Sequence, residues 1–307
     1  MPSATRQRQA KPFVMPDQNP VVGIAFMLAA VTLLFPTMNT AVKYLTAEGY
    51  PYGQVVWARY VGHLVFMMIV FMPRQGLSLF RTARPGVQLM RSFLLFACTA
   101  MYFYALQYID LTVAASISFT SPIIVTALSF AILGERVGIR RLAAVIVGFA
   151  GAMIIIRPGG EAFHWAMLLV VANTFSYAFY QLLTRKMAFN DNPETTNTLT
   201  AVVGALVSSF FLIDGVVLPD NFMDGAMFAG IGVLGGVGHY MVARSFQFAE
   251  ASVVAPFSYG QLIGATILGF LVFGTLPDAW TGVGAVIVAG SGLYIAARER
   301  KKAVKAD

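Results

Sequence analysis

The chain has 307 residues, of which 58% are hydrophobic and only 11% are charged, and its mean hydropathy is +0.71. Because a soluble domain carries about 25% charged residues, this composition excludes a soluble protein and predicts an integral membrane protein. The formal net charge is +7, but the basic residues occupy tails, short connections and helix ends instead of one continuous face. This distribution indicates membrane topology and argues against nucleic-acid binding.

Ten stretches of mostly apolar residues follow one another along the chain, each of about the 20 residues that a membrane-spanning helix needs. They cover residues 21–43, 52–72, 88–109, 112–133, 138–156, 164–185, 196–217, 226–246, 252–273 and 278–297. The connections between them are short, which leaves no room for a soluble catalytic domain. We therefore predict an all-α membrane protein with ten transmembrane helices.

The positive charges indicate how the chain is oriented. If the N-terminal tail, residues 1–20, is cytoplasmic, then nearly all Lys and Arg residues of the connections and the basic tail 298–307 fall on the cytoplasmic side. Only Lys43 and Arg157 fall outside, and Arg59 lies within a span. Since cytoplasmic loops carry this excess of positive charge, we expect a multi-pass protein of the cell inner membrane with both termini in the cytoplasm.

The second half of the chain repeats the first at an offset of about 140 residues. Matched pairs include Gln107 with Gln247, Ser118 with Ser258, Phe130 with Phe270 and Gly134 with Gly274. A repeat of five helices places its two copies upside down relative to each other, which is the architecture of many secondary transporters. We predict inverted repeats at 21–157 and 162–297.

Several short motifs follow in a characteristic order in the first half. They are Ala105-Leu106-Gln107-Tyr108, Ala114-Ala115, Ser121-Pro122 and Leu133-Gly134-Glu135-Arg136. In this order and spacing they resemble the signature of the drug/metabolite transporter superfamily, EamA type, and the likeness extends over nearly the whole chain. The second half departs from the pattern at Gln261-Leu262 and at Gly274-Thr275. The resemblance implies a ten-helix bundle that moves small metabolites, amino acids among them, through a central cavity.

Polar side chains at mid-membrane depth are the candidates for lining this cavity, because an unpaired polar group is costly there. The candidate substrate-binding residues are Asn39, Tyr102, Ser121, Asn173, Tyr177, His239, Tyr240, Tyr259 and Gln261. The alternative is interhelical hydrogen bonding, worth about 0.6 kcal/mol on average. We prefer this alternative for any single Ser or Thr and leave both interpretations open for Asn173, His239 and Gln261.

Five further residues are candidates for gating or coupling: Arg59, His63, Pro36, Pro122 and Pro256. Arg59 and His63 share a helix face at i, i+4. Arg59 is a candidate to attract a carboxylate or to gate the outer mouth, but we favour a structural role, bonded to backbone carbonyls or extended toward the interface. His63 is a candidate to accept a coupling proton near neutral pH, and the alternative is a hydrogen-bonded packing residue. The prolines interrupt or begin spans and are candidate hinges, while Gly232 and Gly236 predict close helix packing.

No acidic residue lies near mid-membrane, which argues against a multidrug pump for small cations. The leading hypothesis is a secondary transporter that exports small neutral or zwitterionic metabolites, most of all amino acids, by alternating access. A permease for a vitamin- or nucleoside-type metabolite is the alternative, indicated by the stretch Ala255–Tyr259 followed by Gln261.

A membrane-embedded enzyme is the weaker alternative, since neither catalytic residues nor a metal site are recognisable, and Cys98 is the only cysteine. We therefore expect a transporter and not an enzyme, without a cofactor. Its partners are a small-molecule substrate and the lipid bilayer, with no nucleic acid, and the choice between monomer and homodimer stays open.

Overall fold

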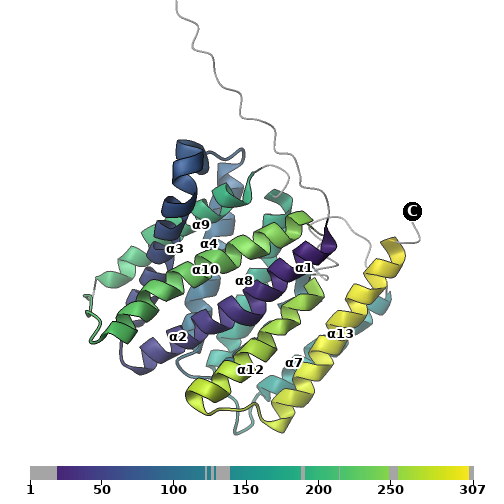
Figure 1. Cartoon of the computed structure of the whole chain (residues 1–307). Helices are drawn as coiled ribbons and strands as arrows, with labels where there is room; N and C mark the ends of the chain where they lie inside the picture. The colour runs from purple at the N-terminus through teal and green to yellow at the C-terminus, as the bar shows by residue number, and fades with distance from the viewer. Residues whose placement is uncertain are drawn as a thin grey trace, which may run out of the picture.

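The computed structural model describes residues 19–121, 123–125, 128, 139–187, 191–213, 215–248 and 255–303, and these contain helices and connections but no strand. The helices run side by side through an elongated bundle, and α1 begins at the same end of the bundle at which α13 ends (Figure 1). Their bounds are Pro20–Leu28 (α1), Phe35–Ala47 (α2), Tyr52–Gln75 (α3), Pro85–Ala105 (α4), Leu111–Ser118 (α5), Ile139–Ile156 (α7), Ala166–Met187 (α8), Pro193–Ser209 (α9), Phe222–Phe248 (α10), Gly260–Phe273 (α12) and Ala279–Ala303 (α13).

Six helical stretches are long and apolar enough to cross a membrane. They are Val21–Ala47, Tyr52–Phe80, Pro85–Ala105, Ala166–Thr184, Pro193–Leu212 and Phe222–Phe248. Shorter apolar helices lie in the other four predicted segments. The all-α, multi-pass class is thus confirmed for the part of the chain that the structure describes, while ten membrane crossings stay a prediction.

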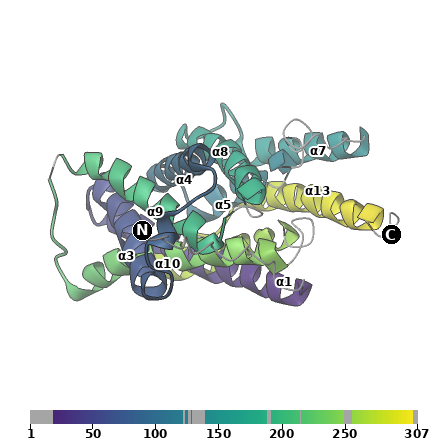
Figure 2. The ribbon, with the colours of Figure 1, turned by 90° about the horizontal axis from the view of Figure 1, so that it is seen from above.

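The packing of the helices follows the sequence repeat. Helix α3 packs against α10, and α4 against α9; in the same way α2 packs against α12, and α8 against α5. In the sequence repeat, α3 corresponds to α9 and α4 to α10, so the α3–α10 contact corresponds to the α4–α9 contact. In the same way α2 corresponds to α8 and α5 to α12, so the α2–α12 contact corresponds to the α8–α5 contact. Helices α7 and α13, which are counterparts of each other, form a pair at one side of the molecule (Figure 2). This pattern supports the two-repeat architecture.

Helices α3 and α10 cross at two glycines. A Cβ atom added to Gly232 would lie 2.4 Å from the Cα atom of Gly62, closer than real Cβ contacts come. The side chain of His63 lies against Gly236, one turn further along α10. The close packing predicted for Gly232 and Gly236 is therefore confirmed, and it brings Arg59 and His63 of α3 against α10.

The first span changes its winding before Pro36. Residues Ala29–Leu34 form a π-helical segment between α1 and α2. Proline has no N–H to donate to the carbonyl of Thr32, four residues earlier. A Cβ atom on Gly264 of α12 would lie 2.1 Å from that carbonyl oxygen and 2.6 Å from the Pro36 ring. The glycine lets the α12 backbone approach the irregular part of the first span.

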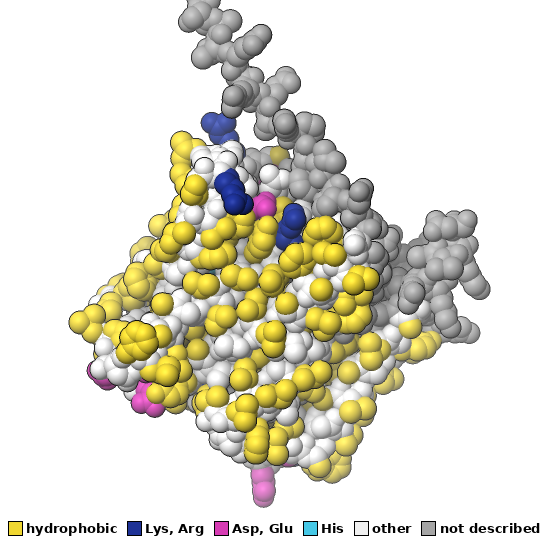
Figure 3. Space-filling view, in the orientation of Figure 1, with side chains coloured by type: hydrophobic (Ala, Val, Ile, Leu, Met, Phe, Trp, Pro, Cys, Tyr) yellow, Lys and Arg dark blue, Asp and Glu magenta, His cyan; other side chains and the backbone are white. Residues whose placement is uncertain are grey.

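On the face that Figure 3 shows, hydrophobic side chains are spread over the bundle between two ends that carry charged side chains. Figure 3 shows Lys and Arg side chains at the end where α1 begins, and acidic side chains mainly at the opposite end. This asymmetry agrees with the predicted orientation, in which the basic end faces the cytoplasm.

Candidate functional site

Four aromatic side chains from both halves of the chain meet inside the bundle, and we call them the aromatic cluster: Phe35 on α2, Tyr177 and Tyr180 on α8, and His239 on α10. The ring centroids of Phe35 and His239 are 4.9 Å apart, and those of His239 and Tyr180 are 6.1 Å apart. Tyr177 stacks on Tyr180 at 5.5 Å. The predicted residues Tyr177 and His239 are thus brought together.

One face of α8 carries polar groups toward the same region. Asn173, Tyr177 and Tyr180 are spaced i, i+4 and i+7, so they share a helix face. Asn173 is buried, and its backbone carbonyl accepts a weak hydrogen bond from the Sγ atom of Cys98 on α4, at 3.7 Å. Ser121, near the middle of the predicted span 112–133, lies 3.4 Å from the Nε2 atom of Gln181, which donates to it.

Several buried polar atoms inside the bundle have no hydrogen-bond partner among the described residues. They include the Nδ1 atom of His239, in the aromatic cluster, and the hydroxyl groups of Tyr102 and Tyr259. The Tyr259 ring packs edge-on against Phe119 at 5.0 Å. A buried polar group without a partner costs about 1–3 kcal/mol, so these groups can gain a hydrogen bond from a ligand.

Arg59 and His63 are more deeply buried than the sequence indicates. Arg59 is 1% exposed and His63 is fully buried. The Nε and Nη1 atoms of Arg59 have no hydrogen-bond acceptor. The burial contradicts the expectation that Arg59 extends toward the interface, and neither of these two atoms bonds a backbone carbonyl. Its guanidinium instead lies over the ring of Tyr60, 4.1 Å from the centroid.

A second buried arginine, Arg91 on α4, is hydrogen-bonded through all three of its side-chain nitrogens. Its Nε atom donates to Thr184 at 2.7 Å, Nη1 donates to Thr200 at 2.7 Å, and Nη2 donates to the Tyr180 hydroxyl at 3.0 Å. From the sequence Arg91 counts as a basic residue of the cytoplasmic border, yet it is 1% exposed. It fixes one edge of the aromatic cluster by holding Tyr180.

The other predicted site residues are distributed unevenly. Tyr240 lies apart from the cluster, since its hydroxyl donates to Glu194 at the start of α9, at 3.1 Å. Asn39 is buried on α2, and Gln261 is half-buried on α12. Among the candidate hinges, Pro36 follows the π-helical segment, and Pro256 lies in the 3₁₀ segment Ala255–Tyr259. Pro122 lies outside the described residues.

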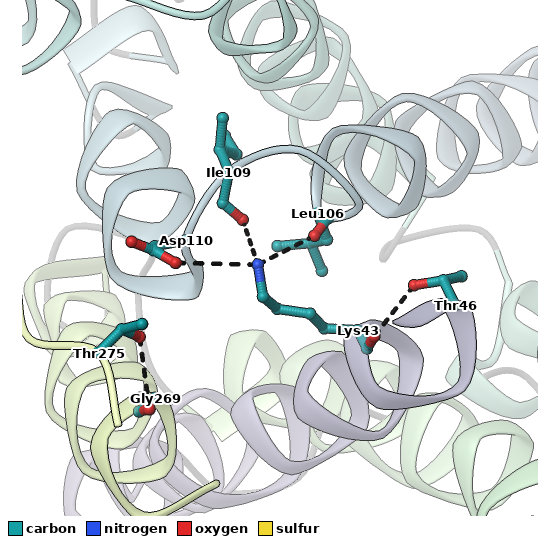
Figure 4. Close-up of polar contacts among 7 residues, drawn as sticks. All are labelled: Lys43, Thr46, Leu106, Ile109, Asp110, Gly269 and Thr275. Carbon is teal, nitrogen blue, oxygen red and sulfur yellow. Dashed lines mark hydrogen bonds and ion pairs between the residues drawn. The ribbon is translucent and has the colours of Figure 1, made fainter. Parts of the chain in front are cut away.

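Lys43 connects helix ends at the end of the bundle opposite to the start of α1. Its Nζ atom donates to the carbonyl oxygens of Leu106 at 3.2 Å and Ile109 at 2.7 Å, and lies 3.9 Å from the carboxylate of Asp110 (Figure 4). It also lies 5.7 Å from the ring centroid of Phe273 on α12. A cation satisfies carbonyls at the C-terminal end of a helix well, so Lys43 joins α2 to the end of α4 and the start of α5.

The buried carboxylates of the described residues lie at the ends of helices. The two buried acidic side chains among the described residues are Asp191 and Asp224. Asp224, at the start of α10, accepts a hydrogen bond from the Tyr50 hydroxyl at 2.7 Å. Asp191 precedes α9 and accepts hydrogen bonds from Thr82 and from the backbone N–H of Ala83. The interior therefore offers aromatic faces and hydrogen-bond donors without an acidic side chain in the aromatic cluster.

This arrangement suits reversible binding of a small solute: both halves contribute to one buried cluster, as expected of a carrier whose halves move around a shared site. The comparison with family models agrees. The chain belongs to the EamA-like transporter family, whose model matches residues 21–157 and 164–297. The resemblance found in the sequence is confirmed, and the protein is a multi-pass membrane protein of a metabolite-transporter family.

Two curated relatives align over most of their length. A riboflavin transporter of Vibrio cholerae is 30% identical over 292 residues, which cover 92% of this chain and 96% of that protein. An S-adenosylmethionine uptake transporter of Rickettsia bellii is 27% identical over 281 residues, covering 91% and 95%. A protein of known crystal structure aligns with a TM-score of 0.63 at 18% identity over 91% of this chain and 97% of its own, which shows the fold alone.

Reasoning from the sequence does not identify Tyr180, Gln181 and Phe35 as members of the site. The signal for Tyr180 and Gln181 was present, because both continue the polar face of α8 that starts at Asn173. Phe35 has no such signal, since an apolar ring in an apolar span has many neighbours to pack against.

Proposed function

We propose that this protein is a secondary transporter for a vitamin-type metabolite with a flat ring system, of the riboflavin class. The aromatic cluster carries this proposal: it presents ring faces from both halves, it includes the unpartnered Nδ1 atom of His239, and no carboxylate takes part. Stacking on an aromatic side chain is worth about 1–3 kcal/mol for a nucleobase ring, and unbonded donors suit the ring carbonyls of such a compound. A small amino acid would leave most of these aromatic faces unused.

The relatives support this alternative over the leading hypothesis from the sequence. Neither of the two reported relatives is named for amino acids; one is named for riboflavin and the other for S-adenosylmethionine uptake. S-adenosylmethionine is the second candidate, because its adenine ring can also stack on the cluster. Amino-acid export stays a prediction without support from these names, and we take uptake as the working direction.

The mechanism follows from the repeat. Repeats at 21–157 and 162–297 rock against each other in the inner membrane, with both termini in the cytoplasm, and expose the cluster to one side at a time. Lys43 bonds Leu106 and Ile109 within the first repeat, and its contact with Phe273, 5.7 Å from the ring centroid, joins this end of the bundle to the second repeat. The π-helical segment before Pro36 is a site at which the first span can bend, because irregular helix turns often mark hinges.

A competition binding experiment tests the substrate class. The purified protein is titrated into riboflavin, and quenching of flavin fluorescence reports binding. We expect saturable quenching that unlabelled flavin analogues reverse, that S-adenosylmethionine reverses more weakly, and that a mixture of the twenty amino acids leaves unchanged. Reversal by an amino acid, or the absence of flavin binding by folded protein, would remove the vitamin-type assignment.

A further inference from the structure

The two buried arginines differ in what surrounds them. Arg59 and Arg91 are each 1% exposed. Every side-chain nitrogen of Arg91 donates to an oxygen acceptor. For Arg59, the Nε and Nη1 atoms have no acceptor, and none of the described carboxylates forms an ion pair with it. Arg59 is thus a buried guanidinium with two nitrogens that find no acceptor among the described residues.

The side chain of Arg59 is nevertheless held in place. The Tyr60 ring lies 4.1 Å from its Cζ atom, and the Tyr60 hydroxyl is bound to Thr99 at 2.9 Å on α4. On the α10 side the neighbour is Gly235, where a Cβ atom would lie 3.3 Å from the Nε atom and 3.1 Å from the sulfur of Met38. The guanidinium is thus positioned where α2, α3 and α10 meet, and Gly235 adds no side chain that would cover its donors.

We propose that Arg59 anchors the transported metabolite by donating hydrogen bonds to a planar oxygen acceptor of that metabolite, either a ring carbonyl or a carboxylate. An unpaired charge inside a membrane protein is costly, and it normally pairs with another group or with a substrate. The described part of the chain supplies no acceptor for the two free nitrogens, so we assign that acceptor to the ligand. This inference rests on the proposed function and deepens it, because it names the chemical group through which the metabolite is held.

The test compares Arg59→Met with Arg91→Met in the full-length protein in detergent, by melting temperature without ligand and by affinity for riboflavin and for S-adenosylmethionine. Removing a buried charge that has no partner relieves its desolvation cost, so Arg59→Met should melt at or above the wild-type temperature. Arg91→Met leaves the oxygens of Tyr180, Thr184 and Thr200 without their donor and should melt lower. Arg59→Met should also weaken ligand binding by tenfold or more.

The two ligands distinguish the two acceptors. A loss of riboflavin affinity identifies ring carbonyls as the anchored group, and a loss of S-adenosylmethionine affinity identifies a carboxylate. Unchanged affinity for both ligands in folded Arg59→Met protein overturns the proposal; if that variant does not fold, Arg59→Gln is measured in its place by the same criterion. If the wild-type protein binds neither ligand, the proposed function fails. The melting temperature of Arg59→Met then decides the role of Arg59: a value at or above that of the wild type supports the anchoring role, and a lower value overturns it.

Discussion

The Nζ atom of Lys43 donates to the carbonyl oxygen of Ile109 at 2.7 Å, which joins the end of the first span to the turn between α4 and α5. The carbonyl of Leu106 and the carboxylate of Asp110 lie within reach of the same ammonium group. Because one side chain makes all these contacts, its removal should loosen this end of the bundle without touching the aromatic cluster.

Lys43→Met should therefore raise the accessibility of this end. In a Cys98→Ser background, a cysteine introduced at the buried position Thr40, one turn earlier on α2, reports the change. We expect a polar maleimide to label it several-fold faster in Lys43→Met than in the parent protein. Lys43→Arg is the matched control, since it keeps the cation and N–H donors. Equal labelling rates in the parent and Lys43→Met would show that Lys43 does not hold this end closed.

Gly232→Ala tests the crossing of α3 and α10. The added Cβ atom would press on the Cα atom of Gly62, and overpacking of this kind costs about 1–3 kcal/mol. We expect a lower melting temperature and slower transport. Gly230→Ala on the same helix is the control, because a Cβ atom there meets nothing within 4 Å and alanine favours a helix. The same melting temperature for both variants would contradict the close crossing.

The apolar segments were predictable from the sequence, because the bilayer sets the length and the hydropathy that a membrane-spanning helix needs. The segment 138–156, for example, corresponds to α7 at Ile139–Ile156. The change of winding at Ala29–Leu34 was not predictable, since it depends on the contact between Gly264 and the carbonyl of Thr32 as well as on Pro36. Local sequence does not contain that contact between distant spans.

The candidate site was predictable only in part. Polarity at mid-membrane depth selected His239 and Tyr240 together, but successive helix residues point about 100° apart, and Tyr240 contacts Glu194 instead of the cluster. From the sequence alone Arg91 is a border residue, because a charge near a helix end is normally a topology signal. Its burial depends on acceptors from α8 and α9, which the sequence does not place beside it.

Tyr177→Ala removes one aromatic face from the cluster while leaving Tyr180 bound to Arg91. Loss of one stacking contact should raise the half-saturating substrate concentration about tenfold, with the melting temperature close to wild type. Tyr108→Ala is the control: Tyr108 is exposed and stacks on His164, so uptake should keep its wild-type kinetics. Identical kinetics for both variants would remove Tyr177 from the site.

Asp278 gives a prediction about pH. Its carboxylate accepts a hydrogen bond from the backbone N–H of Thr281 at 2.8 Å, capping α13, and lies 2.6 Å from Arg157. The hydrogen bonding by Thr281, with the Arg157 charge, holds the pKa of Asp278 below its usual value. A lowered pKa means that the stabilisation is complete above about pH 4, the unfolded-state value, and is lost as the pH falls through the folded-state value.

Asp278→Ala should lower stability by about 0.5–2 kcal/mol, the usual cost of losing such a cap. The melting-temperature difference from wild type should be constant above pH 5 and shrink as the pH is lowered through the folded-state pKa of Asp278. Arg74→Ala, a basic residue in the last turn of α3, serves as the comparison at another connection. A difference for Asp278→Ala that grows on acidification would contradict the assignment.

Uptake into proteoliposomes tests the vitamin-type assignment most directly. Vesicles containing the protein, and matched empty vesicles, are given labelled riboflavin, labelled S-adenosylmethionine or labelled amino acids in parallel. We predict saturable, protein-dependent riboflavin uptake that excess unlabelled riboflavin abolishes, with no amino-acid uptake above the empty vesicles. Saturable transport of an amino acid, together with riboflavin counts equal to those of empty vesicles, would contradict the account.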